Sequence, residues 1–290
     1  MASVACFLQR VPLTGIEEWT DLSSARIPTV EIRRNGVPMP DNRLRRFNVT
    51  MGLVHLIQSV AVFALSADFA LPVTTAFSRI DLSTEKLVTD YRIAFELEIG
   101  PLVALFLLLS ALAHFVISTH WVYPWYTRNL GRGANYARWI EYSISSSVMI
   151  VIIAMLVGIY DAVALLALFA INATMILFGW LMELHNQSAE RTNWTSYWFG
   201  VFAGAIPWIA ITVYLIGAGG AEGGPPGFVY GIFFSIFVFF NIFAINMVLQ
   251  YRKVGRWADY LYGEWIYILL SLFAKTALAW QVFAGTLRPV

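Results

Sequence analysis

The feature that most constrains the fold is a series of apolar stretches, each about as long as a membrane-spanning helix. A helix needs ~20 predominantly apolar residues to cross the hydrocarbon core of a bilayer. Such stretches cover residues 47–66, 99–119, 137–160, 162–184, 195–216, 228–249 and 261–285. Only 13% of the residues are charged, and the mean hydropathy is +0.66. The sequence therefore predicts an all-α membrane protein, a bundle of seven transmembrane helices in which short connections make consecutive helices antiparallel neighbours.

One connection, residues 67–97, is longer than the others. Its second half, LVTDYRIAFEL (87–97), partly alternates apolar with polar side chains, which is the pattern of a β-strand. We expect an external β-hairpin in this first interhelical loop. Two interpretations of its exposed edge stay open, because the edge can pair with a second subunit or the hairpin can fold onto its own bundle.

The first 46 residues lack the long apolar core and cleavage site of a secretory signal. We interpret residues 1–46 as a mostly irregular cytoplasmic extension that ends in the basic run DNRLRR, and residues 47–290 as the seven-helix domain. A single cysteine, Cys6, excludes an internal disulfide framework and a multi-cysteine metal site. The formal net charge of +1 argues against nucleic-acid binding, which needs a concentrated basic surface.

The placement of Lys and Arg predicts the orientation, because positive charge is retained on the cytoplasmic side. The N-terminal extension and the loops on its side of the membrane hold most of these residues. They are Arg10, Arg26, Arg33, Arg34, Arg43, Arg45, Arg46, Arg128, Arg132, Arg138, Arg191, Arg252, Lys253 and Arg256. The opposite side has Arg79, Lys86, Arg92 and Arg288. We therefore expect a cytoplasmic N-terminus and an external C-terminus.

Lys275 lies in the middle of the last apolar stretch, too far from either end for its ammonium group to reach water easily. A charge at that depth costs ~2.5–3.5 kcal/mol on insertion scales. Burial could keep the amine neutral, or backbone carbonyls could bind it. The third alternative is an anionic partner, and Glu141 is the carboxylate that lies away from a helix end. Side chains lean toward the N-terminus of their helix, which brings both groups toward the cytoplasmic half.

Polar residues recur at one-turn spacing on three of the predicted helices, and residues four apart share a helix face. The pairs are Ser110 with His114, Glu141 with Ser145, and Ser271 with Lys275. We predict that these faces converge on one buried pocket, which His55 of the first helix can join. For any single serine, a hydroxyl bonded to its own helix is the simpler interpretation, and a backbone partner is as plausible for His55.

A buried lysine amine can condense with an aldehyde to form a Schiff base, and the protonated imine then needs a fixed counterion. Glu141 would be that counterion. Aromatic and small residues provide a slot for a flat apolar cofactor, although ordinary packing explains many of them equally well. The candidates are Trp208 beside Pro207, Phe237, Phe240, Met175 and Gly179.

Two stretches, RWIEYSISS (138–146) and SLFAKTALAWQVFAGTL (271–287), resemble the heliorhodopsins, a branch of the microbial rhodopsins with inverted topology, as does the Ser110 and His114 pair. The resemblance covers residues 45–290. It implies that all-trans-retinal is attached covalently to Lys275 as a Schiff base and that Glu141 is the counterion. It also implies a polar cavity and a slot for the polyene. The cavity would contain Tyr142, Ser145, Ser110, His114, Ser271 and His55, and the slot Met175, Ile176, Gly179, Trp208 and Phe240. A homodimer and a slow photocycle suited to sensing are further implications.

With this resemblance, the sequence predicts a light-sensing photoreceptor that signals through its conformation to a cytoplasmic partner and is neither an enzyme nor a pump. Pumping needs a second proton relay, yet three turns beyond Glu141 the chain has Ile152, and SVMIVIIAML (147–156) has no titratable group. A light-gated proton or ion channel, or a transporter, is the alternative. A solute transporter or enzyme without retinal would show interrupted helices in two repeated halves, but no repeat is present and Pro207 stands alone.

Overall fold

The computed structural model describes residues 42–219 and 224–287, and these contain seven helices long and apolar enough to cross a membrane. The fold class expected from the sequence is therefore confirmed. The spanning helices are α1 (Asn42–Leu65), α2 (Ile99–Ser118), α4 (Tyr136–Leu156), α5 (Ala162–Asn186), α6 (Thr195–Gly219), α7 (Gly227–Tyr251) and α8 (Tyr260–Val282). The shorter elements are β1 (Ala70–Asp81), β2 (Lys86–Glu98), α3 (Tyr123–Leu130), η2 (Gly255–Ala258) and η3 (Phe283–Leu287).

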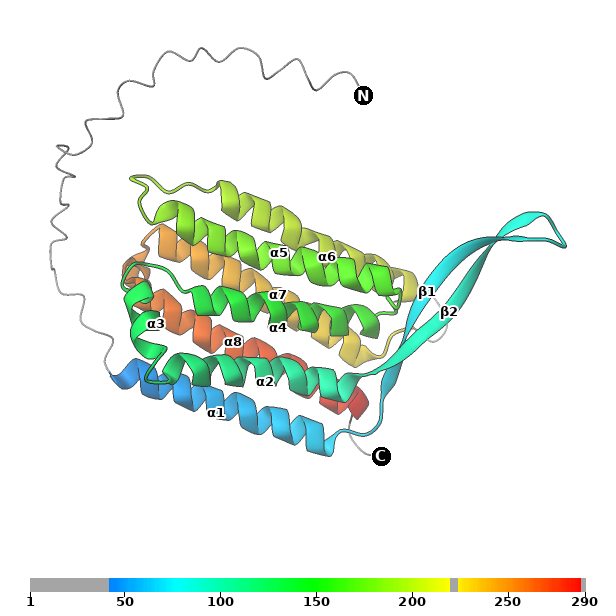
Figure 1. Ribbon diagram of the computed structural model, residues 1–290, viewed down its shortest axis with the longest axis horizontal. Coiled ribbons are helices and arrows are strands. Elements are labelled where there is room, and N and C mark those ends of the chain that lie inside the picture. Colours follow the sequence, from blue (N-terminus) through cyan, green and yellow to red (C-terminus); the bar gives the residue numbers. More distant parts are fainter. Residues whose placement is uncertain (1–41, 220–223, 288–290) are drawn as a thin grey trace, which may run out of the picture. The chain divides into compact units, whose positions relative to one another are not determined.

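Helix α4 occupies the centre of the bundle (Figure 1). It packs against α2 and α5, and it carries a run of fully buried apolar side chains that includes Ile150, Ile152 and Met155. The pairs α1–α2, α5–α6 and α7–α8 also pack closely. The backbones of α6 and α7 approach each other less closely than those of the other consecutive helices, because large aromatic side chains such as Trp208 and Phe237 lie between them. The two helices also flank a cavity.

Several helix ends differ from the predicted boundaries. Helix α1 begins at Asn42 rather than at residue 47, so most of the DNRLRR run is helical. Leu44 is buried in a cluster with Tyr126 and holds this first turn in place. Helix α4 ends at Leu156 rather than at residue 160, because Gly158 has φ +99°, a conformation that ends a helix. The rest of the predicted extension, including Cys6, lies outside the described residues.

The predicted hairpin is present as an antiparallel pair of strands, with an irregularity between Val73 and Thr74. Its base is attached to the bundle. The Thr74 amide donates to the carbonyl of Tyr160 over 2.8 Å, and Val73 is buried. The outer part extends beyond the helix ends (Figure 1) with exposed apolar side chains. The base of the hairpin therefore folds onto its own bundle, whereas among the described residues the outer parts of the two strands pair only with each other.

Helix α3 was not expected from the sequence, since its eight residues, YPWYTRNL, are too few and too polar to span a membrane. Figure 1 shows it running across the end of the bundle that lies opposite the hairpin. Pro124 stands in its first turn, where a missing amide hydrogen costs nothing. Tyr126 and Leu130 are buried beneath it. This end of the bundle is called the α3 end below.

Candidate functional site

The central feature of the site is an ion pair inside the bundle. The Lys275 Nζ atom lies 2.7 Å from Glu141 Oε1, and the Lys275 side chain is almost fully buried. Ser110 completes the arrangement, since its hydroxyl donates to Glu141 Oε1 over 2.7 Å and accepts from Lys275 Nζ over 2.5 Å. The contact between the two charges that the sequence suggested is thus present. A buried charge is tolerated when it is paired and hydrogen-bonded in this way.

The direction of the helices explains why these groups meet. Helices α4 and α8 are the third and seventh spans and run the same way across the bundle. Lys275 also lies 5.2 Å from the centre of the Tyr142 ring, so the aromatic face supplies a second favourable contact for the cation. The Tyr142 hydroxyl donates to the carbonyl of Tyr267 over 2.9 Å, which ties α4 to α8 beside the pair.

A second polar layer surrounds Glu141 on the side of α1 and α2. His114 Nδ1 lies 2.8 Å from Asn48 Oδ1, and the rings of His114 and His55 stack with their centres 5.9 Å apart. A small cavity of about 40 Å³ is lined by Asn48, Ser110, His114 and Glu141 among others. His55 is buried next to this set and makes no hydrogen bond to it within the described residues. Asn48 was missed, because an isolated asparagine in a helix carries no spacing signal.

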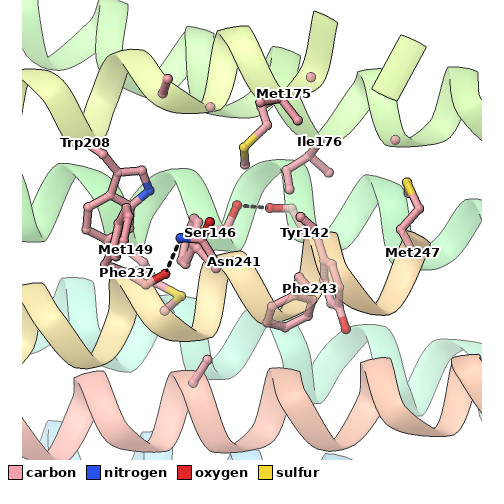
Figure 2. Close-up of a pocket in the computed structure, with 18 of the residues that line it drawn as sticks. Tyr142, Ser146, Met149, Met175, Ile176, Trp208, Phe237, Asn241, Phe243 and Met247 are labelled. Carbon is pink, nitrogen blue, oxygen red and sulfur yellow. Dashed lines mark hydrogen bonds between the residues drawn. The ribbon is translucent and has the colours of Figure 1, made fainter. Parts of the chain in front are cut away.

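A larger cavity of about 580 Å³ begins at Lys275 and extends between α4, α5, α6 and α7. Figure 2 shows Met175 and Ile176 on one side of it, with Tyr142, Phe243 and Trp208 arranged around the others. The predicted residues that line it are Tyr142, Ser145, Met175, Ile176, Gly179, Trp208, Phe237, Phe240, Ser271 and Lys275. Lining residues that the sequence did not single out include Ser146, Met149, Asn241, Phe243, Met247 and Tyr267. Pro207, by contrast, does not line it.

Aromatic rings close one end of this cavity. The Trp208 ring packs edge-on against Phe237 and Phe240, with ring centres 5.2 and 5.5 Å apart. Glycine at position 179 is required by close packing, since a β-carbon there would overlap the ring of Trp139. On the α6–α7 side the lining includes exposed Ile209 and Asn241, so the cavity opens toward the surrounding lipid between these helices.

A second buried ionic cluster lies one helical turn from Glu141 toward the α3 end. The Arg138 guanidinium donates to Glu183 Oε1 over 2.5 Å and to Glu264 Oε1 over 2.6 Å. The backbone amide of Asn135 donates to Glu183, and its side-chain amide donates to Glu264. The sequence-based assignment of Arg138 to the loop charges is therefore wrong. The sequence does contain a signal for this cluster, since Glu183 and Glu264 are two of the few carboxylates near the ends of the predicted spans.

The site fits a long, flat, apolar molecule with an aldehyde at one end. Small-molecule cavities are usually ~300–1,000 Å³ and mostly apolar, with a few polar groups that fix orientation. Here Tyr142, Ser145 and Ser271 accompany Lys275, and the rest of the lining is mostly aromatic, aliphatic and methionine side chains, with Ser196, Thr212 and Asn241 as further polar members. No group of three or more metal-ligating side chains occurs within residues 42–219 and 224–287.

The comparisons with known proteins agree with this geometry. Seven spanning helices around a cavity that ends at a lysine of the last helix define a rhodopsin-type membrane protein. The fold resembles the crystal structure of a light-driven proton pump from Leptosphaeria maculans, with a TM-score of 0.58 and 15% sequence identity over 83% of this chain and 95% of the other. The chain belongs to the heliorhodopsin family, whose sequence model matches residues 44–287. No curated protein sequence matches the chain significantly. Family membership makes it a rhodopsin, and rhodopsins bind retinal.

Proposed function

We propose that the protein is a light-sensing photoreceptor in which all-trans-retinal is attached to Lys275 and Glu141 is the counterion. The observation that carries the proposal is the buried Lys275–Glu141 pair at the polar end of an otherwise apolar cavity. Retinal would supply an aldehyde that condenses with the lysine amine, with loss of water, and a polyene that absorbs visible light and isomerises.

The residues around Lys275 have distinct roles in this proposal. Glu141 neutralises the cationic nitrogen, and Ser110 holds the carboxylate in place through its hydroxyl. Tyr142 covers the nitrogen with its ring face. Trp208 and Phe240 pack at the far end and fix the position of the polyene. Ser145, Ser271, Met175, Ile176 and Gly179 form the walls of the cavity.

The half of α4 that lies nearer the hairpin favours signalling through conformation over proton pumping. The segment from Val148 to Met155 is apolar and buried except for the partly buried Val151, and Ile152 occupies the position where a proton relay would be needed. Separating the Lys275–Glu141 pair is unfavourable in this low-dielectric interior, so a change at Lys275 biases the helices that carry the two groups. The protein would act in the membrane as a homodimer, with a cytoplasmic N-terminus, an external C-terminus and a cytoplasmic signalling partner.

The first test is the formation of a pigment. The purified full chain is mixed with all-trans-retinal and its absorption spectrum is followed. We expect a visible band for the wild type and none for Lys275→Ala, while Lys253→Ala, a lysine in the α7–α8 turn, serves as the matched control. A band of equal size in Lys275→Ala would refute the assignment of Lys275 as the attachment site.

A second test separates sensing from transport. The pigment is expressed in cells, and the external pH and the membrane current are recorded under flash illumination. A photoreceptor of the proposed kind gives a photocycle with neither signal. A steady photocurrent or a light-driven pH change would instead establish the channel or transporter alternative.

A further inference from the structure

A surface outside the cavity has the chemistry of a phospholipid-binding site. It lies on α1, where residues spaced three or four apart form a single exposed stripe. Leu53, Ile57, Val60 and Phe63 of this stripe are between 47% and 66% exposed. An apolar stripe on the outside of a membrane bundle faces lipid tails. Toward the start of the helix the same stripe continues through Thr50, Arg46 and Arg43, which are also exposed.

The depth of Arg46 follows from helix geometry. Nineteen steps separate it from Leu65, the last residue of α1, and at about 1.5 Å per residue the distance is roughly 29 Å. The hydrocarbon core of a bilayer is about 30 Å thick. Arg46 therefore lies at the boundary between lipid tails and headgroups, at the level of the phosphate groups, when Leu65 lies at the opposite boundary.

The neighbouring end of α2 adds aromatic groups at the same level. Arg45 Nε donates to the carbonyl of Ser118 over 2.7 Å, and the Arg45 guanidinium lies 5.6 Å from the centre of the Tyr123 ring. These contacts join the start of α1 to the end of α2. Immediately after this end come His120 and Trp121, whose rings lie 4.0 Å apart, and Trp121 is 78% exposed. Tryptophan is enriched at membrane interfaces, where its ring lies among the headgroups.

Charge decides the class of lipid. Among the described residues, no carboxylate forms an ion pair with Arg46, in contrast to Arg92 of the hairpin, which pairs with Asp90. An exposed cation on the lipid-facing side attracts an anionic headgroup. We propose that Arg46, together with the exposed Trp121, forms a binding site for an anionic phospholipid in the leaflet at the α3 end. The occupant is a lipid rather than a protein, because Arg46 continues a stripe of tail-facing apolar residues.

The test measures lipid retention. The full chain is incorporated into nanodiscs that contain equal amounts of phosphatidylglycerol and phosphatidylcholine with identical acyl chains, is then extracted in mild detergent, and its bound lipids are quantified by mass spectrometry. We expect the wild type to retain phosphatidylglycerol preferentially. Arg46→Gln should lower this preference about fivefold, which corresponds to about 1 kcal/mol per interfacial arginine. Arg256→Gln, an exposed arginine in η2, is the matched control and should leave the preference unchanged.

Three results would overturn the proposal. One is equal retention of the two lipids by the wild type, and another is an equal loss in Arg256→Gln, since it would mean that the net charge of this end acts without a defined site. The third is displacement of the bound lipid by inorganic phosphate at the same concentration, because the site would then be a site for free anions. A visible absorption band that is unchanged in Arg46→Gln would show that the variant is folded.

Discussion

Replacing Arg138 by methionine tests whether the ionic cluster at the α3 end holds the bundle together. The Arg138 side chain is 4% exposed, and its guanidinium binds Glu183 and Glu264 at 2.5 and 2.6 Å. At such a distance and an effective dielectric constant of about 20, each attraction is worth roughly 6 kcal/mol before desolvation is subtracted. Breaking a buried pair by removing one partner has a net cost of about 3–5 kcal/mol. Methionine keeps the length and apolar character of the stem, so packing changes little.

The assay is thermal unfolding of the purified protein in one detergent, followed by tryptophan fluorescence. We expect Arg138→Met to lower Tm by roughly 10 °C. The double variant Arg138→Met/Glu264→Gln should recover part of the loss, because it removes one of the two unpaired carboxylates. Glu183 would still accept hydrogen bonds from Asn135, Trp139 and Tyr260. If the double variant is no more stable than Arg138→Met, the loss comes from packing and the electrostatic reasoning is wrong.

Three further predictions follow from the site and the hairpin. Glu141→Gln removes the anion that stabilises the cationic nitrogen of Lys275, so the protonated Schiff base releases its proton more readily. Titration of the visible absorption band should therefore show that the variant loses its colour at a lower pH than the wild type. Identical titration curves would contradict the counterion role. Gly179→Val places atoms where the Trp139 ring lies, and it should slow and reduce pigment formation on addition of retinal, whereas Gly217→Val in open space on α6 should not. Thr74→Pro deletes the amide that donates to Tyr160, so protease should cut the hairpin of the folded protein faster and give two fragments sooner on a denaturing gel, while the cut protein still elutes as one species in gel filtration; an unchanged cutting rate would contradict the role of this hydrogen bond.

Sequence alone predicted the parts of the site that are built from residue types rarely found inside a membrane. Lysine and glutamate are so costly inside a membrane that Lys275 and Glu141 stand out, and their helices run in the same direction. Ser110 could be added because it lies one turn from His114. The apolar walls are different, since many phenylalanines and methionines compete for each position and only tertiary packing decides which of them face the cavity. Met149, Phe243 and Met247 were missed for this reason.

The predicted start of the first helix was wrong because residues that end an apolar stretch can still be helical. The charged residues Arg43, Arg45 and Arg46 ended the apolar stretch, but arginine and leucine are good helix formers, and Leu44 anchors the extra turn. The sequence-based assignment of Arg138 to a loop was wrong for a related reason. It follows a polar loop and was therefore assigned to the surface, yet its two carboxylate partners come from helices that lie more than forty residues away in sequence. Local composition does not show such a pairing; as for Lys275 and Glu141, it becomes visible only when the few carboxylates in or near the spans are compared across the whole chain.

The Arg138 cluster also has a mechanical consequence. One guanidinium fastens α4 to α5 and to α8, so the three helices that supply Glu141, Gly179 and Lys275 form a stiff frame at the α3 end. Helices α6 and α7 are attached to this frame through α5 and α8, and they contact each other through the rings of Trp208, Phe237 and Phe240. A change in the shape of the cavity contents would therefore press first on these rings, and so on the two helices that the Arg138 cluster does not fasten.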